Sequence, residues 1–409
     1  MRSSSQAEIL CIGTELTKGT VVNTNAAYLS KELTQLGFEV VGHSACQDDF
    51  KAIEESLGLA LRRSDVVCVS GGLGPTPDDI TRDALAAYFK VPLRFSAAQF
   101  RLIERLYQKR KRKVPALVRR EAMFPANARP ILNRFGIALG FVIEEHGKVV
   151  AVLPGVPGEL TRLFEYRIKP LLRRRFKNLK PLSALVVKTV GLSEPAIMQR
   201  LGKSFFKLGA FQFGIYPSVG EVSLRLYSDR SSVIRRLKTH AQWVLGDSIY
   251  SFADETLDGV VAKALCERGI TVCAAESCTG GKVSELFTRL PGASRYFRGA
   301  VVSYHDEAKI EFLRVPRETL QRYWAVSRQT ALAMAEGARS RFQTTLGLSV
   351  TGIAGPAGES PSKPVGLVYL AVVSSKRRRV WEENFTGYRE QIQARASKKL
   401  LEYLWQWLR

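Results

Sequence analysis

The sequence lacks the cysteine spacing of a zinc site and the long apolar runs of a membrane protein. It holds six cysteines, at 11, 46, 68, 266, 273 and 278, and none forms a CxxC pair. Apolar stretches such as 149–156 fall far short of the ~20 residues that cross a bilayer. No long apolar segment follows the first residues. We therefore expect no membrane association, reduced thiols and a cytoplasmic location.

Acidic residues are scarce relative to basic ones. The chain has 61 Lys and Arg against 38 Asp and Glu, a formal net charge of +23. Basic runs occur at 109–113, 173–175 and 376–379. Such charge indicates either a partner with phosphates, including nucleic acid, or a solvated basic surface. No aromatic-rich stacking motif accompanies the runs, which favours the solvated surface and leaves nucleic acid binding open.

Length and patterning predict an α/β protein of several domains. Hydrophobic residues make up 45% of 409 residues, enough for two or three cores. In the first third, strand-like runs at 8–12, 38–41 and 65–70 alternate with helical patterns at 23–36 and 48–63. This alternation predicts a mostly parallel sheet covered on both faces. We expect domains at 1–178, 179–252 and 253–409, the middle one a small α+β connector.

The segment 275–281, AESCTGG, follows a strand-like run at 271–275 and precedes a helical run at 282–290. A hydroxyl there lies at the positive end of a helix, where unpaired N–H groups hold an oxyanion or a phosphate. The plainer alternative is a helix N-cap by Ser277 or Thr279. Polar or glycine-rich turns also follow predicted strands at 303–309 and 351–356, where open α/β sheets place ligand sites.

These segments resemble the C-terminal domain of CinA proteins, whose members include nicotinamide mononucleotide deamidases. The matching motifs are AESCTGG at 275–281, PGAS at 291–294, YHDEAK at 304–309, AVS at 325–327, TGIAGP at 351–356 and KPVG at 363–366. The resemblance implies hydrolysis of a linear amide, converting nicotinamide mononucleotide to nicotinate mononucleotide and ammonia in pyridine-nucleotide salvage, with no cofactor.

The resemblance also implies a role for individual residues. Ser277 would be the nucleophile and Lys309 its base, assisted by Tyr304; a lysine can take this proton if desolvation lowers its pKa. The implied substrate-binding residues are Thr279, Gly280, Gly281, Thr351, Gly352 and Arg389, the last as a phosphate ligand. The chain departs from the family pattern at Asp306, Ala357 and Tyr388, positions that spare the nucleophile and the base.

A second glycine-rich turn, GGLGPTPDDIT at 71–81, follows the strand-like run at 65–70. Glycines allow an anionic ligand to approach closely, and two adjacent aspartates can bind a divalent cation beside phosphates. An ordinary helix N-terminus is the alternative. With GTEL at 13–16, VNTN at 22–25 and PGVP at 154–157, the turn resembles the N-terminal CinA domain. That domain is similar to molybdopterin-binding proteins of the MogA/MoaB type.

In CinA proteins this domain is associated with metal-dependent ADP-ribose pyrophosphatase activity. The resemblance therefore implies a divalent metal ion at Asp79. The implied phosphate and nucleotide site comprises Gly71, Gly72, Gly74, Asp78, Asp79 and Glu159. Where the family is polar or prefers GTAPG, the chain has Leu117, Val118, Ile137 and Leu139.

The resemblance implies a Rossmann-like three-layer N-terminal domain, a KH-like connector and a homodimer. The connector likeness rests on GLSE at 191–194 and GEV at 220–222. The leading hypothesis is the amidase. The alternatives are an ADP-ribose pyrophosphatase in the N-terminal domain and a non-catalytic binding protein related to competence or DNA damage.

Overall fold

The computed structural model describes residues 5–358 and 360–409; Met1–Ser4, which open the first predicted domain, and Glu359 lie outside the described residues. The chain divides into two compact units, Met1–Ser183 and Ala184–Arg409. The predicted connector and C-terminal domain both fall in the second unit, so the finer division into three stays a prediction. Among the described residues, no helix is both long and apolar enough to cross a bilayer.

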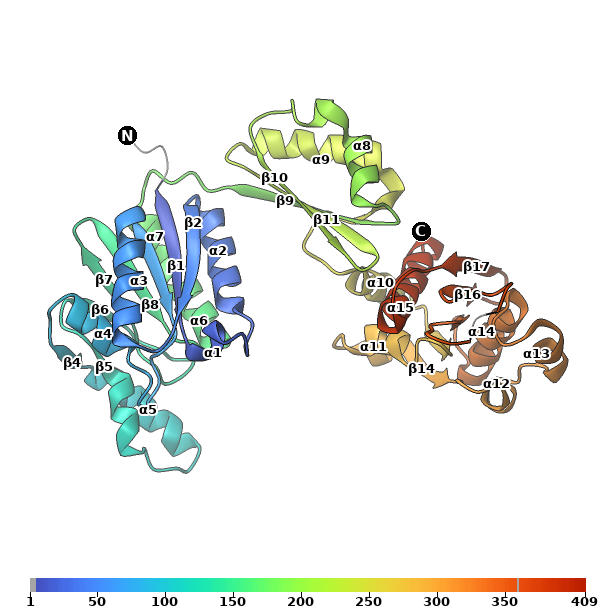
Figure 1. Cartoon of the computed structure of the whole chain (residues 1–409), viewed down its shortest axis with the longest axis horizontal. Coiled ribbons are helices and arrows are strands. Elements are labelled where there is room, and N and C mark those ends of the chain that lie inside the picture. Colours follow the sequence, from blue (N-terminus) through green and yellow to red (C-terminus); the bar gives the residue numbers. More distant parts are fainter. Residues whose placement is uncertain (1–4, 359) are drawn as a thin grey trace. The chain divides into compact units, whose positions relative to one another are not determined.

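The first unit is built on a six-stranded sheet in the order β2-β1-β3-β8-β7-β6 (Figure 1). Its strands are β1 Gln6–Ile12, β2 Glu39–Cys46, β3 Val66–Ser70, β6 Ala128–Ile131, β7 Gly140–Glu145 and β8 Lys148–Leu153, and a separate pair comprises β4 Leu93–Phe95 and β5 Met123–Pro125. The helices are α1 Thr14–Thr17, α2 Thr24–Leu36, α3 Phe50–Arg63, α4 Thr81–Tyr88, α5 Ala97–Lys109, η1 Ala116–Ala122, α6 Pro157–Leu163, η2 Phe164–Ile168 and α7 Lys169–Arg175.

Alternation along the central strands separates two apolar layers. In β1, Ile9 belongs to the core under α2, α6 and α7, whereas Leu10 belongs to the core under α3 and α4. β2, β1, β3 and β8 run parallel, β7 is antiparallel to β8, and β6 is antiparallel to β7. The expected mostly parallel sheet, covered on both faces, is confirmed.

The second unit begins with a smaller sheet, β10-β11-β9-β12, under two helices. Its elements are β9 Ser183–Val190, α8 Glu194–Phe205, β10 Gln212–Ser218, β11 Glu221–Ser228, α9 Ser231–Leu245, η3 Gly246–Ser248 and β12 Ile249–Ser251. Apolar residues of both helices pack on alternate residues of the strands in one core. This arrangement is the α+β connector expected from the sequence.

The rest of the second unit is a five-stranded sheet, β14-β13-β15-β16-β17 (Figure 1). Its strands are β13 Val272–Glu276, β14 Phe297–Val302, β15 Leu346–Gly352, β16 Leu367–Val373 and β17 Arg378–Asn384, and its helices are α10 Leu257–Glu267, α11 Lys282–Thr288, η4 Ala293–Arg295, α12 Asp306–Leu313, α13 Arg317–Tyr323, α14 Arg328–Phe342 and α15 Arg389–Trp407. On β13, Ala274 faces the core of α10, α11 and α15, and Ala275 faces the core of α12 and α14.

Candidate functional site

Ser277 immediately follows β13, an inner strand of the C-terminal sheet. β13 pairs in parallel with β14 and with β15, so the carboxyl ends of all three strands meet at one edge. The Ser277 N–H donates to the Val350 carbonyl at 2.9 Å, and the Ser303 N–H donates to the Glu276 carbonyl at 2.8 Å. This register brings Ser277 beside the segment that begins with Tyr304.

The turn after Ser277 is organised by a buried carboxylate, Glu276, which is not among the predicted site residues. Its side chain is fully buried. It accepts hydrogen bonds from Thr279 Oγ1 at 2.7 Å, Gly281 N at 3.0 Å, Val283 N at 3.1 Å, Ser284 N at 2.8 Å and Ser284 Oγ at 2.5 Å. Glu276 therefore satisfies the first N–H groups of α11. Its signal in the sequence is a glutamate that ends an apolar strand.

The hydrogen bonds to Glu276 reduce the number of backbone N–H groups in the glycine turn that could bind a substrate. The Gly281 N–H is bound to Glu276, and the Gly280 N–H donates to the Ser277 carbonyl at 3.2 Å. Among the described residues, the Thr279 N–H donates no hydrogen bond. It is therefore the backbone donor of the predicted set that is available to a substrate oxygen.

Lys309, the predicted base, lies on α12 and is 1% exposed. Its Nζ donates to the Tyr304 carbonyl at 3.2 Å and lies 3.4 Å from Asp306 Oδ1. Burial lowers the pKa of Lys309, while the Asp306 carboxylate acts in the opposite direction. A lysine in this setting loses its proton more readily than one in water.

Arg389 connects the predicted substrate-binding segments. It is the first residue of α15, and its Nη2 donates to the Tyr304 hydroxyl at 2.6 Å. Its Nη1 donates to the Gly355 carbonyl at 2.8 Å, in the turn after β15. The Tyr304 side chain is 59% exposed. Because a guanidinium has five N–H groups, Arg389 can hold Tyr304 and still bind an anion.

Thr351 and Gly352 are the last two residues of β15; Thr351 is buried and Gly352 is half-buried. Thr351 Oγ1 donates to the Ala325 carbonyl at 2.7 Å. A Cβ at Gly352 would lie 2.6 Å from the Leu367 carbonyl oxygen, so the glycine lets β16 approach. Both contacts shape the edge of the sheet beside Ser277, and direct substrate contact by these two residues stays a prediction.

Cys278 lies next to Ser277 and is an alternative nucleophile by position. It is 4% exposed, and burial raises the pKa of its thiol to about 12. The thiolate is the reactive form of cysteine. Cys278 is therefore a protonated, buried side chain at neutral pH, and the role of Ser277 as nucleophile stays a prediction.

In the first unit, one pocket of about 500 Å³ collects every predicted N-terminal site residue. These are Gly71, Gly72, Gly74, Asp78, Asp79 and Glu159. The turn needs glycine at 71, where φ is +109° and a Cβ would lie 2.0 Å from the Ile12 carbonyl oxygen. The prediction did not include Asn25, Asp48 and Glu121, which also line the pocket.

The pocket is acidic although the chain is basic. Its charged lining residues are Glu15, Asp48, Asp78, Asp79, Glu121 and Glu159, without a lysine or arginine among the lining side chains of the described structure. Several of these carboxylates already accept hydrogen bonds, Asp79 and Asp48 among them. Asp79 Oδ2 accepts from the Thr76 N–H at 3.0 Å and from its hydroxyl, and Asp48 Oδ2 accepts from the Thr14 N–H at 2.8 Å.

These positions decide whether the pocket can hold a metal ion through protein ligands. Asp78 is exposed, with its pKa lowered by a hydrogen bond from Thr76. Among the described residues, no group of three or more His, Cys, Asp or Glu side chains is arranged to hold a metal ion. The predicted ligand Asp79 is instead part of the turn. The residues present do not fit a metal held by protein ligands alone.

Two carboxyl groups in this pocket have raised pKa values. Burial raises the pKa of Glu121 to about 7, with Arg82 opposing and Asp79 and Glu159 reinforcing the shift. Glu121 is 1% exposed, and its Oε1 has no hydrogen-bond partner among the described residues. Burial also raises the pKa of Glu159, which accepts from Asn133 Nδ2 at 2.6 Å.

Comparison with known families accounts for nearly the whole chain. Residues 254–408 match the family model of the CinA C-terminal domain, and residues 8–174 match the one described as a probable molybdopterin binding domain. A competence-damage inducible protein of Caldicellulosiruptor saccharolyticus is 36% identical over 97% of this chain and 98% of its own. One from Desulforudis audaxviator is 42% identical over 91% of each chain.

The chain belongs to the CinA family. Among solved structures, it is similar to the competence/damage inducible protein CihA of Agrobacterium tumefaciens, with 39% identity over 36% of this chain and 91% of that one, and a TM-score of 0.36. In this CinA protein, the four apolar residues that depart from the family pattern lie in different environments. Ile137 lines the N-terminal pocket, Val118 and Leu139 are buried, and Leu117 is 57% exposed.

Proposed function

We propose that this CinA protein hydrolyses a linear amide, converting nicotinamide mononucleotide to nicotinate mononucleotide and ammonia. The observation that carries the proposal is the meeting of Ser277 and the Tyr304–Lys309 segment at adjacent strand ends, with Lys309 buried and its pKa lowered. A nucleophile needs a neighbouring group to take its proton, and a desolvated amine can do so. The motifs shared with nicotinamide mononucleotide deamidases support the choice of substrate.

In the first step, neutral Lys309 accepts the Ser277 hydroxyl proton while Ser277 Oγ attacks the carboxamide carbon. The Thr279 N–H is the available backbone donor for the resulting oxyanion, and one such donor is worth ~3–4 kcal/mol in other enzymes. The Lys309 ammonium then donates its proton to the leaving nitrogen. The C–N bond breaks, ammonia departs and an ester of Ser277 remains.

In the second step, water attacks the ester carbonyl while Lys309 takes one of its protons. The ester C–O bond breaks, and the proton returns from Lys309 to Ser277 Oγ. The products are nicotinate mononucleotide and the free enzyme. Arg389 binds the substrate phosphate in this scheme and positions Tyr304 through their 2.6 Å hydrogen bond.

The experiment is ammonia release from nicotinamide mononucleotide by wild type, Ser277→Ala and Lys309→Met. We expect each variant to lose about 10³-fold or more in rate, because nucleophile and base act together. Cys278→Ala is the matched control beside the nucleophile and should keep the rate within a few-fold. Equal rates for wild type and Ser277→Ala would remove Ser277 from the mechanism. No ammonia from wild type would refute the assignment.

A second candidate activity, ADP-ribose pyrophosphatase, is favoured by the pocket of about 500 Å³ in the first unit. Six acidic side chains line it, so a pyrophosphate needs added cations there. The test is ADP-ribose cleavage with and without a divalent metal salt, in wild type and Asp79→Ala. Cleavage that is indifferent to both changes would refute this site.

A further inference from the structure

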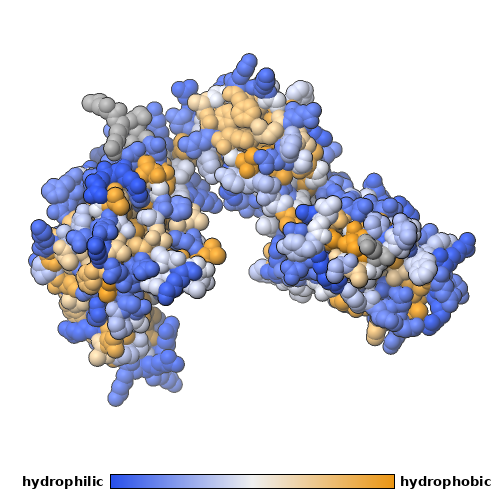
Figure 2. All heavy atoms as spheres, in the orientation of Figure 1, coloured by the Kyte–Doolittle hydropathy of each residue, from blue (hydrophilic) through white to orange (hydrophobic). Residues whose placement is uncertain are grey.

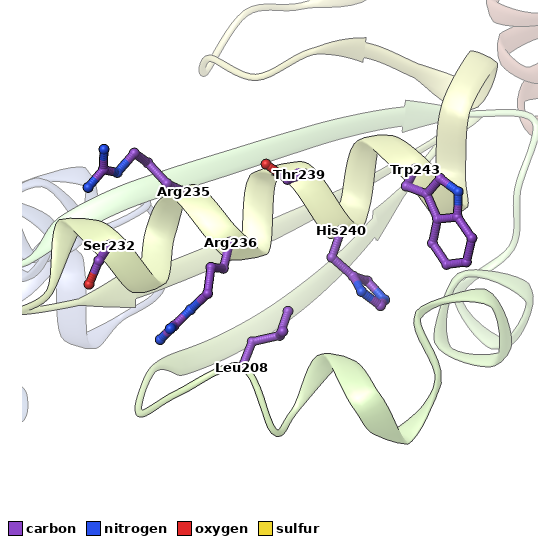
Figure 3. A pocket seen from close by; sticks show the side chains of 7 residues that line it. All are labelled: Leu208, Ser232, Arg235, Arg236, Thr239, His240 and Trp243. Atoms are coloured by element: carbon purple, nitrogen blue, oxygen red, sulfur yellow. The ribbon is translucent and has the colours of Figure 1, made fainter.

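The connector presents a charged and aromatic surface on α9 that neither proposed activity uses. Val233, Leu237, Ala241 and Leu245 form the buried stripe of this helix. Its other faces line a pocket of about 660 Å³ together with Leu208, which lies between α8 and β10. The helix residues in this α9 surface are Ser232, Arg235, Arg236, Thr239, His240 and Trp243 (Figure 3).

Trp243 is 82% exposed, yet it is held in place. Its ring meets His240 edge to face, with centroids 6.2 Å apart and planes at 70°. His240 lies 5.5 Å from the Phe205 ring, and its Nε2 is 3.1 Å from the Leu201 carbonyl oxygen. Figure 3 shows Arg236, His240 and Trp243 projecting from the side of α9 that faces Leu208. An ordered indole with such exposure is a ready stacking platform.

Most charged side chains around Trp243 are basic, and the exposed Asp247, four residues later, is paired with Arg409 at 2.7 Å. Arg235 and Arg236 form no ion pair within the described part of the chain, and the nearby sequence adds Arg200, Lys203 and Lys207. The acidic residues between 197 and 245 are Glu221 and Asp229. Glu221 is engaged by Lys398 at 2.7 Å, so its charge is compensated. Figure 2 shows hydrophobic residues beside strongly hydrophilic ones on the connector.

We propose that the α9 surface binds single-stranded nucleic acid, with an unpaired base stacked on Trp243 and phosphates bound by Arg235 and Arg236. Sequence-tolerant binding of single strands combines these two elements, a positive groove and aromatic planes. A duplex keeps its bases paired and offers no free base plane to the indole. From Ser232 to Trp243 the surface extends about 16 Å along the helix, which suits a strand better than one free nucleotide.

Charge complementarity distinguishes this occupant from the others. A second copy packed on the same surface would bring Arg235 and Arg236 against their own counterparts, because a two-fold contact is self-complementary. An acidic peptide would satisfy the arginines but would leave the planes of Trp243 without a partner. A single strand satisfies both groups at once.

The test is fluorescence anisotropy of a labelled single-stranded DNA oligonucleotide with full-length protein at low salt. Trp243→Ala should weaken binding about tenfold, the usual effect of losing one stacking platform. Arg235→Glu/Arg236→Glu should weaken it further and flatten the dependence on salt. Trp324→Ala, which removes another exposed indole (70%), and Arg110→Glu/Arg112→Glu, which makes the same charge change in the run at 109–113, should change binding less than threefold.

Competing outcomes are measured in the same assay. Equal losses in the α9 variants and the 109–113 variant would overturn the proposal in favour of diffuse electrostatic attraction. Equal affinity for duplex DNA, for poly-glutamate or for a free nucleotide would overturn it as well. A dimer that dissociates with Trp243→Ala, without DNA binding, would assign the surface to a second copy. Ammonia release by Trp243→Ala should equal that of wild type, so this proposal and the amidase succeed or fail separately.

Discussion

Lys309 Nζ lies 3.4 Å from Asp306 Oδ1, one turn earlier on α12. The two side chains differ in setting, since that of Lys309 is 1% exposed and that of Asp306 is 50% exposed. Burial lowers the pKa of the lysine, and the carboxylate raises it. The CinA pattern has asparagine at position 306, so this chain carries an added charge beside the proposed base. The aspartate keeps that base protonated to a higher pH than asparagine would.

The first prediction concerns Asp306→Asn and the pH dependence of ammonia release. Without the carboxylate, Lys309 should lose its proton at lower pH, and the acidic limb of the kcat/KM profile should move to lower pH. A half-exposed ion pair is worth ~0.5–1 kcal/mol, which corresponds to about half a pH unit. The control is Glu307→Gln, which removes the same charge from a neighbour paired with Arg317 at 3.1 Å. Identical shifts in both variants would contradict a specific action of Asp306.

The second prediction is that Glu276→Gln destabilises the second unit by about 2–4 kcal/mol. Glutamine has one acceptor oxygen for five donors, and its NH₂ group would face N–H groups of α11. Ammonia release should fall as well, because the turn holds Ser277. Urea unfolding followed by tryptophan fluorescence measures this directly, since all five tryptophans lie in the second unit.

Ser284→Ala is the graded control for Glu276. It removes one of the five hydrogen bonds, the one from the Ser284 hydroxyl, and should cost about 1 kcal/mol. If Glu276→Gln costs no more than Ser284→Ala, the buried carboxylate does not organise the turn.

The third prediction separates two roles of Arg389. If it binds the substrate phosphate, Arg389→Lys should raise KM for nicotinamide mononucleotide about tenfold and leave the slower hydrolysis of nicotinamide riboside, which has no phosphate, unchanged. If only the contact of Arg389 with Tyr304 matters, Arg389→Lys should lower kcat for both substrates. Tyr304→Phe removes that contact without changing charge and is the matched comparison. Equal losses for both substrates in Arg389→Lys would contradict phosphate binding.

Elements whose apolar residues face a buried core could be predicted from sequence. β13 and β3 are buried along their whole length, and the runs at 271–275 and 65–70 predict them within a residue. The starts of two helices could also be predicted, because the side chains of Asn23 and Asp49 cap α2 and α3. In each case the signal lies in a few consecutive residues.

The extent of β2 was predicted wrongly, and the reason is physical. The apolar run at 38–41 predicts a short strand, but β2 extends over Glu39–Cys46. It is an edge strand whose residues alternate between exposed and half-buried, and its backbone pairs with β1 throughout. Backbone pairing stabilises such a strand without an apolar run, so its polar half carries no hydrophobic signal.

The candidate sites also contain residues that local sequence predicts and residues whose setting depends on distant segments. Motif spacing predicts Ser277 and the segment from Tyr304 directly after two strands, and Lys309 lies on α12 within that second segment, because the order of strands, turns and helices is local information. The burial of Glu121 depends on segments far away in the sequence, including Arg82 of α4 and Glu159 of α6, and no pattern around residue 121 indicates it. Among the described residues, the fold encloses its Oε1 without a hydrogen-bond partner.

The fourth prediction follows from that isolation. The pKa of Glu121 is raised from 4.5 to about 7 in the folded chain, mainly by burial. A carboxyl group with a raised folded-state pKa contributes its full stability below the unfolded value. That contribution is lost as the pH rises through about 7, because the buried group must then ionise. Glu121→Gln removes the ionisation, so the variant should gain stability over wild type between pH 5 and pH 8.

The gain should be on the order of 2–3 kcal/mol larger at pH 8 than at pH 5, because the loss in wild type begins near the unfolded value and is complete above about 7. Far-UV circular dichroism melts at the two pH values measure it. Tryptophan fluorescence supplies an internal control, because it follows the second unit and should show no change in either condition. Glu54→Gln, on the exposed face of α3, is the matched substitution and should change stability by less than about 0.5 kcal/mol at both pH values. A Glu121→Gln effect that is the same at pH 5 and pH 8 would contradict a raised pKa of Glu121 in the folded chain.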